Sequence, residues 1–144
     1  MLGDKRVMTA IPVKDVDRAR SFYEGVLGLK FVGGPRADGS YEYACGSGTG
    51  LFTYPTPENS GRSPATLAAW QVDDIHATAN ALRDKNIALE EYDTPGLQTD
   101  AGIATLPRGR TIWFKDPDGN ILNAFERAEN LPDHLDAPHP AVPS

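Results

Sequence analysis

Residues 113–126 read WFKDPDGNILNAFE, and this stretch decides the fold. Two apolar segments flank a short polar sequence, KDPDGN, whose composition is that of a tight turn. Pro117 presets the backbone φ of such a turn, Gly119 accepts a positive φ, and aspartates hydrogen-bond their own backbone. The stretch therefore predicts two strands joined by a structural turn, with its two carboxylates in water rather than tuned for catalysis.

Upstream of this hairpin, one pattern occurs twice. The sequence VKDV at 13–16 recurs as VDDI at 72–75, each time after an apolar strand. Asp15 and Asp74 are then N-caps of helices whose apolar residues recur at helical spacing, and Gly28 suits the C-terminal cap of the first helix. The repeat predicts two copies of one strand–helix module.

The remaining segments complete the two modules. After the first helix we expect strands at 29–34, 40–45 and 50–54, which makes the first half β-α-β-β-β, followed by a polar, proline-rich linker at 55–64. The second half holds a strand beginning at 87–92, a weakly structured connection at 93–108, and strands at 110–116 and 120–126. The second half matches the first if the connection contains or replaces one strand.

The V-x-D before the first helix, the helix ending in FYEGVLGLKF and the later DPDGN turn together resemble the vicinal oxygen chelate superfamily, the glyoxalase/bleomycin resistance/dioxygenase-like proteins. The resemblance covers residues 6 to about 126. It implies an α+β fold in which two tandem βαβββ modules form a cupped mixed β-sheet with flanking helices. The single domain would span residues 1–126, with modules at about 6–54 and 65–126 and a proline-rich tail at 127–144.

Composition excludes several classes of function. The 144 residues suit one domain, and 40% are hydrophobic, too many for a disordered chain. The formal net charge of −6 argues against nucleic acid as a partner, and no apolar run is long enough to span a membrane. We expect a cytoplasmic protein. Cys45 is the only cysteine, which rules out an internal disulfide, and we expect a small buried side chain there.

Enzymes of the superfamily typically hold one divalent metal ion in the cup. Carried over to this sequence, the ligand positions fall on Met8, Leu67 and Asn123, with a fourth near Tyr54. Thioether, alkyl, carboxamide and phenol groups make a poor ligand set for such metals. None of the three histidines, His76, His134 and His139, lies on a predicted strand. We therefore expect neither a metal ion nor another cofactor.

The resemblance then implies a protein that binds a small organic molecule between its modules, with a homodimer as the expected assembly. Arg108 and Arg110 are expected to be solvated, with contact to an anionic ligand as the alternative. A second hypothesis is an enzyme of the same fold, of lyase, isomerase or dioxygenase-like type. It would use Tyr54, Cys45 or Glu42 for proton transfer, or bind a metal through other ligands. The expected ligand-binding residues are Met8, Phe52, Tyr54, Leu67, Trp113 and Asn123.

Overall fold

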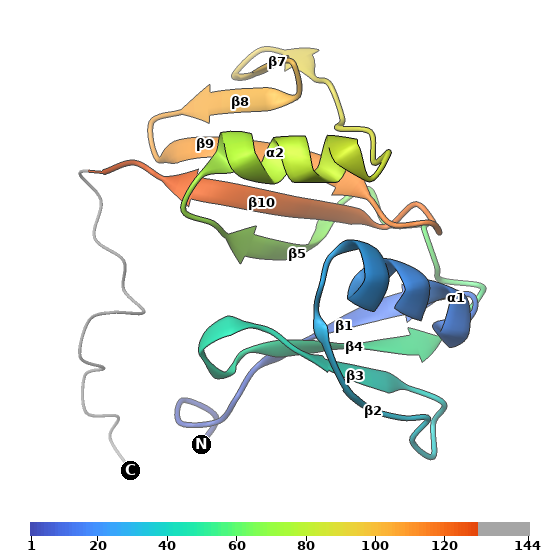
Figure 1. Cartoon of the computed structure of the whole chain (residues 1–144). Helices are drawn as coiled ribbons and strands as arrows, with labels where there is room; N and C mark the ends of the chain where they lie inside the picture. The colour runs from blue at the N-terminus through green and yellow to red at the C-terminus, as the bar shows by residue number, and fades with distance from the viewer. Residues whose placement is uncertain (130–144) are drawn as a thin grey trace.

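A computed structural model of the chain describes residues 1–129, in which two β-sheets stand next to each other, each with its own helix (Figure 1). The first sheet has the order β1 (Met8–Val13), β4 (Gly50–Pro55), β3 (Tyr41–Ala44), β2 (Lys30–Gly33). Its helical segment is α1 (Val16–Arg20), which continues as the π-helical η1 (Ser21–Val26), and a short 3-10 turn, η2 (Gly46–Gly48), precedes β4.

The second sheet repeats this order and extends it. It runs β5 (Thr66–Gln71), β10 (Ile121–Arg127), β9 (Gly109–Lys115), β8 (Ile103–Leu106), β7 (Leu97–Asp100), β6 (Asp93–Thr94), and its helix is α2 (Ile75–Asp84). In both sheets the first strand pairs in parallel with the last, and the other pairs are antiparallel. The α+β fold built from two βαβββ-like modules is thus confirmed, as two mixed sheets.

Both helices begin where the sequence predicts. The side chain of Asp15 accepts hydrogen bonds from the backbone N–H groups of Asp17 and Arg18, and Asp74 does the same for His76 and Ala77. Each carboxylate thereby satisfies two of the four N–H groups that a helix start leaves without partners. No helix among the described residues is long and apolar enough to cross a membrane.

One prediction in the second module is wrong, because residues 87–92 contain a single bridge, Leu89 to Phe114, instead of a strand. The connection at 93–108 has more structure than predicted, with three short strands, and one of them, β8, is the strand that the second module needed in order to match the first. The β8 strand exists because it pairs with β9, where Ala104 lies opposite Thr111 and Thr105 opposite Arg110. The residues next to β8 in the sequence are mostly polar and show no alternation typical of a strand. It can therefore be identified as a strand only from its pairing with β9. The tail predicted at 127–144 lies largely outside the described residues.

One hydrophobic core serves both modules. Buried side chains of the first sheet, such as Ile11 and Leu51, belong to the same cluster as Ile75 of α2 and Phe114 and Leu122 of the second sheet. Each of these five residues is at most 2% exposed. Because the core is continuous, the two halves support each other.

The expectation that the turn carboxylates lie in water is also wrong. Asp116 is 5% exposed, and the side chain of Asp118 is 4% exposed. Asp118 Oδ2 accepts hydrogen bonds from the Lys14 backbone N–H (2.8 Å) and the Ser60 hydroxyl (3.0 Å), and its other oxygen pairs with Arg18. The start of α1 and the linker therefore cover this turn, a contact between segments far apart in the sequence.

Asn120 and Asp116 complete this connection. Asn120 Nδ2 donates to the Pro12 carbonyl (2.7 Å) and to Asp116 Oδ2 (2.8 Å), while Asn120 Oδ1 accepts from the Gly61 N–H (2.9 Å). The Tyr23 hydroxyl donates to the same Asp116 oxygen at 2.8 Å. The turn is structural, as predicted, but it fastens the second module to the first.

Candidate functional site

The strand register sorts the predicted site residues by sheet face. In the first sheet, Met8, Phe52 and Tyr54 alternate with the buried Ile11 and Leu51, so they lie on the face opposite the helices, here called the open face. The rings of Phe52 and Tyr54 are 6.1 Å apart, and all three side chains are half-buried. The structure thus groups three of the six predicted residues on one surface.

Two more predicted residues meet on the second sheet. Trp113 of β9 and Asn123 of β10 are direct cross-strand partners on its open face, opposite the buried Leu122. Trp113 Nε1 donates to the Thr66 hydroxyl at 3.2 Å, and its ring meets Tyr92 edge to face at 5.4 Å. These contacts hold the indole in one orientation beside Asn123.

Leu67 does not join this group. The register between β5 and β10 shifts, so that Thr66 pairs with Ile121 while Ala68 pairs with Leu122, and Leu67 is the extra residue of a β-bulge. Its side chain packs against the hydrophobic core. Sequence patterns assign strand residues to one face or the other by strict alternation, and a bulge interrupts that alternation. No residue near Leu67 in the sequence signals the bulge.

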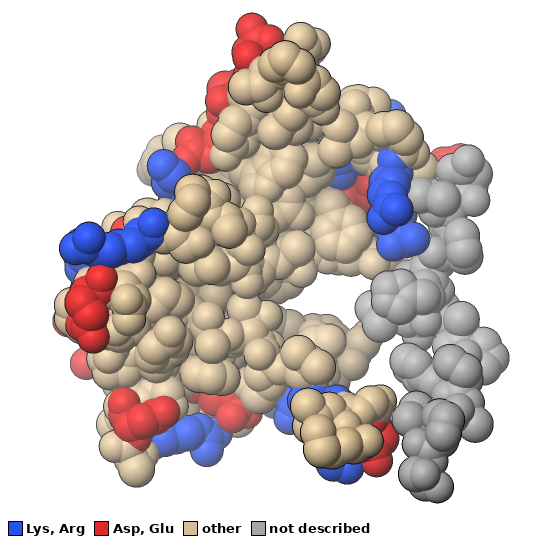
Figure 2. All heavy atoms as spheres, turned by 180° about the vertical axis from the view of Figure 1, so that it is seen from behind, with Lys and Arg blue, Asp and Glu red and all other residues tan. Residues whose placement is uncertain are grey.

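Two cavities lie along the open face of the second sheet and at its junction with the first module. We call these two cavities together the open-face cleft. The first, of about 340 Å³, includes Arg108, Thr111, Trp113, Asn123, Phe125 and Glu126. The second, of about 400 Å³, includes Cys45, Ser47, Gly50, Ala69, Gln71 and Phe125. Phe125 lines both, so the cavities adjoin, and Figure 2 shows this side of the molecule hollowed between the two halves.

Asn123 offers one hydrogen-bond acceptor to the first cavity. The residue is 7% exposed, and its Nδ2 donates to the Thr111 hydroxyl (2.5 Å) and the Ile112 carbonyl (3.0 Å). A carbonyl can only accept, so the amide nitrogen must face it. Asn123 Oδ1 accepts no hydrogen bond from any described residue, which leaves it available to a donor in the cavity.

Charged side chains surround the same cavity. Arg108 and Arg110 line it, and Arg108 forms no ion pair within residues 1–129. Arg110 Nη1 lies 3.3 Å from His76 Nε2, and Glu126 Oε1 accepts from the Ile75 N–H at the start of α2. In Figure 2, Lys and Arg atoms flank the hollow on the second module. This rim favours a ligand with negative or electron-rich groups.

The donor set of the cleft does not fit a divalent metal ion. The groups that lie around Asn123 are hydroxyl, indole and guanidinium groups and one carboxylate, Glu126, which already accepts a hydrogen bond from the Ile75 N–H. The one thiol, Cys45, lines the other cavity, so the cleft lacks the clustered carboxylate, imidazole or thiolate ligands that such ions require. Within residues 1–129, no three His, Cys, Asp or Glu side chains lie close enough to hold a metal. No chemical step through a metal follows from this site.

The three residues considered for proton transfer do not share one site. Glu42 is ion-paired with Arg36 at 2.7 Å, Tyr54 is on the open face of the first sheet, and Cys45 lines the second cavity. Phe125, Thr111 and the buried orientation of Asn123 were missed by sequence reasoning. Strand alternation from Asn123 could have found Phe125, since the two are separated by one residue of β10.

Comparison with known proteins places this geometry in a family context. The family model "Glyoxalase/Bleomycin resistance protein/Dioxygenase superfamily" matches residues 5–123. Among curated proteins, no sequence matches the chain significantly. Among solved structures, TnmS3, an antibiotic binding protein from Streptomyces sp. CB03234, is similar with a TM-score of 0.70 and 22% identity, over 89% of this chain and 99% of that one.

Two other solved structures show the range of functions on this fold. Lactoylglutathione lyase from Agrobacterium tumefaciens has a TM-score of 0.62 and 21% identity, covering 85% of this chain and 93% of its own. The fosfomycin resistance protein FosX from Listeria monocytogenes has a TM-score of 0.61 and 12% identity, with the same coverage. At such identities the likeness is one of fold alone.

Proposed function

Since the chain belongs to the glyoxalase/bleomycin resistance protein/dioxygenase superfamily, we propose that it binds a small organic molecule in the open-face cleft without a metal ion. The observation that carries this proposal is Asn123. It stands where the superfamily resemblance expects a metal-binding carboxylate, and it is held as a single buried hydrogen-bond acceptor instead. A neutral acceptor among aromatic side chains suits an organic ligand better than a cation.

The lining of the cleft defines the ligand class. Trp113 and Phe125 offer aromatic surfaces to a planar ring, and Asn123 Oδ1 accepts from an N–H or O–H group of that ring system. Arg108 and Arg110 favour an electron-rich or anionic substituent at the rim. Because two cavities adjoin at Phe125, the cleft suits an elongated, polycyclic molecule. The fold neighbour described as an antibiotic binding protein makes aromatic antibiotics the first class to test.

A second copy of the chain completes the proposed assembly. Met8, Phe52 and Tyr54 form an apolar surface on the open face of the first sheet, and each is only half-buried in the single chain. Apolar surfaces of this kind gain free energy when a partner covers them. A homodimer that covers this face would also enclose the ligand.

An enzyme of the same fold is the second candidate, and Cys45 is its best-placed group because it lines the second cavity. No described residue forms a hydrogen bond with its sulfur, so no activating base is in place. Binding therefore accounts for more of the site than catalysis does.

The test is calorimetric titration of an aromatic antibiotic, with doxorubicin as the probe, against the wild type and Asn123→Leu, with the metal content of the same samples measured. We expect metal-free protein to bind, and Asn123→Leu to bind about tenfold more weakly, because a buried hydrogen bond contributes about 1–2 kcal/mol. Asn80→Leu makes the same change on the exposed face of α2 and should leave affinity unchanged. Stoichiometric metal whose removal abolishes binding would contradict the proposal, as would full affinity in Asn123→Leu.

A further inference from the structure

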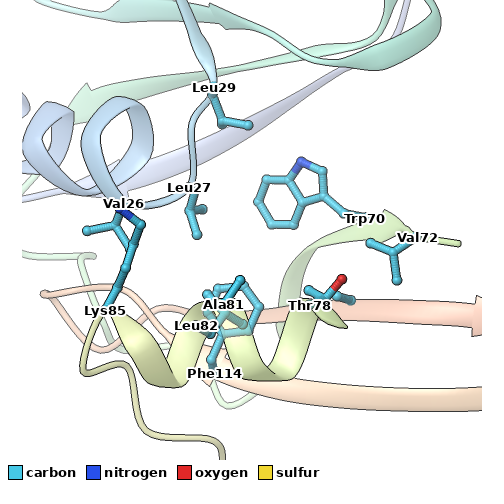
Figure 3. Close-up of a pocket in the computed structure, with 11 residues that line it drawn as sticks. Val26, Leu27, Leu29, Trp70, Val72, Thr78, Ala81, Leu82, Lys85 and Phe114 are labelled. Atoms are coloured by element: carbon cyan, nitrogen blue, oxygen red, sulfur yellow. The ribbon is translucent and has the colours of Figure 1, made fainter. Parts of the chain in front are cut away.

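A separate cavity of about 230 Å³ lies on the helix side of the sheets, away from Asn123 (Figure 3). Its lining comes from the end of η1 and the residues after it, from α2, and from the helix-facing side of the second sheet. Figure 3 shows Leu27 and Trp70 pointing into the space above Phe114. We call this cavity the helix-side pocket, and its wall residues used below are Leu27, Trp70, Ala81, Lys85 and Phe114.

The chemistry of the helix-side pocket is almost wholly apolar. Its one hydroxyl, on Thr78, already donates to the Asp74 carbonyl at 3.1 Å. Its one charge is Lys85, an exposed residue at the end of α2 that forms no ion pair with any described residue. A ligand for this pocket therefore needs an apolar body and at most one charged group, which must be negative.

The volume sets the size of that body. An apolar cavity of roughly 150 Å³ is enough to bind benzene. The helix-side pocket, at about 230 Å³, has room for one aromatic ring with a short side chain. Such a ring would lie among Leu27, Trp70 and Phe114, and its side chain would reach the rim.

We propose that the helix-side pocket binds a compact aryl or alkyl carboxylate, with the apolar body between the modules and the carboxylate paired with Lys85. The site is distinct from the open-face cleft, since its residues come from the helices and from the helix-facing side of the second sheet. Trp70 is the one side chain that lines both this pocket and the second cavity of the cleft. The proposal does not depend on the function proposed for the cleft.

The chain offers an optical test, because only one of its two tryptophans, Trp70, lines the helix-side pocket, whereas Trp113 lines the open-face cleft alone. Trp70 also borders the second cavity of the cleft, so a variant that fills the helix-side pocket must show which site gives the response. The variant Trp113→Phe leaves Trp70 as the sole reporter. Titration of this variant with phenylacetate should give a saturable change in emission. Ala81→Phe, added at an exposed position of the pocket wall, should fill the pocket and abolish the change. Ala77→Phe, exposed on the same helix outside the pocket, should preserve it and controls for the new ring.

A second set of measurements tests the ion pair between Lys85 and the carboxylate of the ligand. Lys85→Gln should weaken phenylacetate binding about fivefold, as expected for a partly exposed ion pair. Phenylacetamide has the same shape as phenylacetate but no charge. It should bind the Trp113→Phe variant about fivefold more weakly than phenylacetate does. Lys30→Gln, an exposed lysine on β2 with no described partner, should have no effect.

Four results would overturn the proposal. The first is the absence of a saturable Trp70 response, and the second is a response that persists in folded Ala81→Phe protein. The third is equal affinity for the acid and the amide. The fourth concerns a second copy of the chain as the occupant of the pocket, which sedimentation velocity of the same variants tests. If the wild type is an oligomer and Ala81→Phe dissociates it, a second copy fills this pocket and the carboxylate proposal fails.

Discussion

Asp116 is the residue whose environment differs most from that of an ordinary turn carboxylate. It accepts hydrogen bonds from the Tyr23 hydroxyl, the Asn120 amide, and the backbone N–H groups of Asp118 and Asn120. These four donors compensate the loss of water around a carboxylate that is 5% exposed. Tyr23, itself fully buried, is the only one of them from the first module.

The Tyr23–Asp116 hydrogen bond predicts a specific dependence of stability on pH. Burial, with the nearby Asp116 charge, raises the pKa of Tyr23 well above its ordinary value of about 10. The folded protein therefore keeps the proton while the unfolded chain loses it, so this contribution is complete below pH of about 10 and declines as pH rises further.

Tyr23→Phe should consequently lower the free energy of unfolding by about 2 kcal/mol at neutral pH, because a hydrogen bond to a charged group is lost. Above pH of about 10 the difference from the wild type should narrow, since the variant has no hydroxyl to ionise. Urea unfolding across this pH range measures both effects. Tyr92→Phe, a half-buried tyrosine whose hydroxyl has no described partner, is the control. A difference that does not vary with pH would contradict the assignment.

Helix α2 shows an element that local sequence specifies almost completely. Asp74 caps its start, and Ile75, Ala79 and Leu82 recur at helical spacing on the buried side, each at most 6% exposed. One contribution is not local: Glu126 Oε1, from β10, accepts from the Ile75 N–H. The strand β8 is the opposite case, because its pairing with β9 alone makes it a strand.

The cap predicts the outcome of a single substitution. Asp74→Ala should lower the free energy of unfolding by about 1 kcal/mol, since the His76 and Ala77 N–H groups lose their acceptor. Asp73→Ala removes the same charge one residue earlier, where the side chain is exposed and makes no described hydrogen bond, and should change stability little. Thermal unfolding of both variants makes the comparison, and equal losses would argue that charge rather than capping is responsible.

At the scale of the whole molecule, we expect the DPDGN turn and the continuous core to make the two modules unfold as one cooperative unit. Asn120, which is 1% exposed, bonds both the Pro12 carbonyl at the end of β1 and the Gly61 N–H in the linker. Gly61 itself has a φ of 69°, and a side chain there would collide with the Asp118 carbonyl at 1.9 Å. The linker therefore packs tightly on the turn.

Asn120→Ala should destabilise both modules together, by about 2–4 kcal/mol, because it leaves buried backbone groups without partners. Tryptophan fluorescence reports the second module, which holds both tryptophans, and hydrogen exchange at Tyr43 and Leu51 reports the first. We expect the same unfolding free energy from both probes, reduced equally by the substitution. Asn59→Ala, at an exposed linker position, is the control. A first module that unfolds at its own denaturant concentration would refute the single unit.

The amino-acid sequence alone determined the repeated module, both helix caps and the hairpin at DPDGN. These features depend on residues within a few positions of each other, where periodicity and turn chemistry act directly. The tertiary structure alone decided the burial of Asp116 and Asp118, the bulge at Leu67, the strands within 93–108 and the pairing of Trp113 with Asn123. Each of those depends on a partner distant in the sequence, because burial and strand pairing are properties of what packs against a segment.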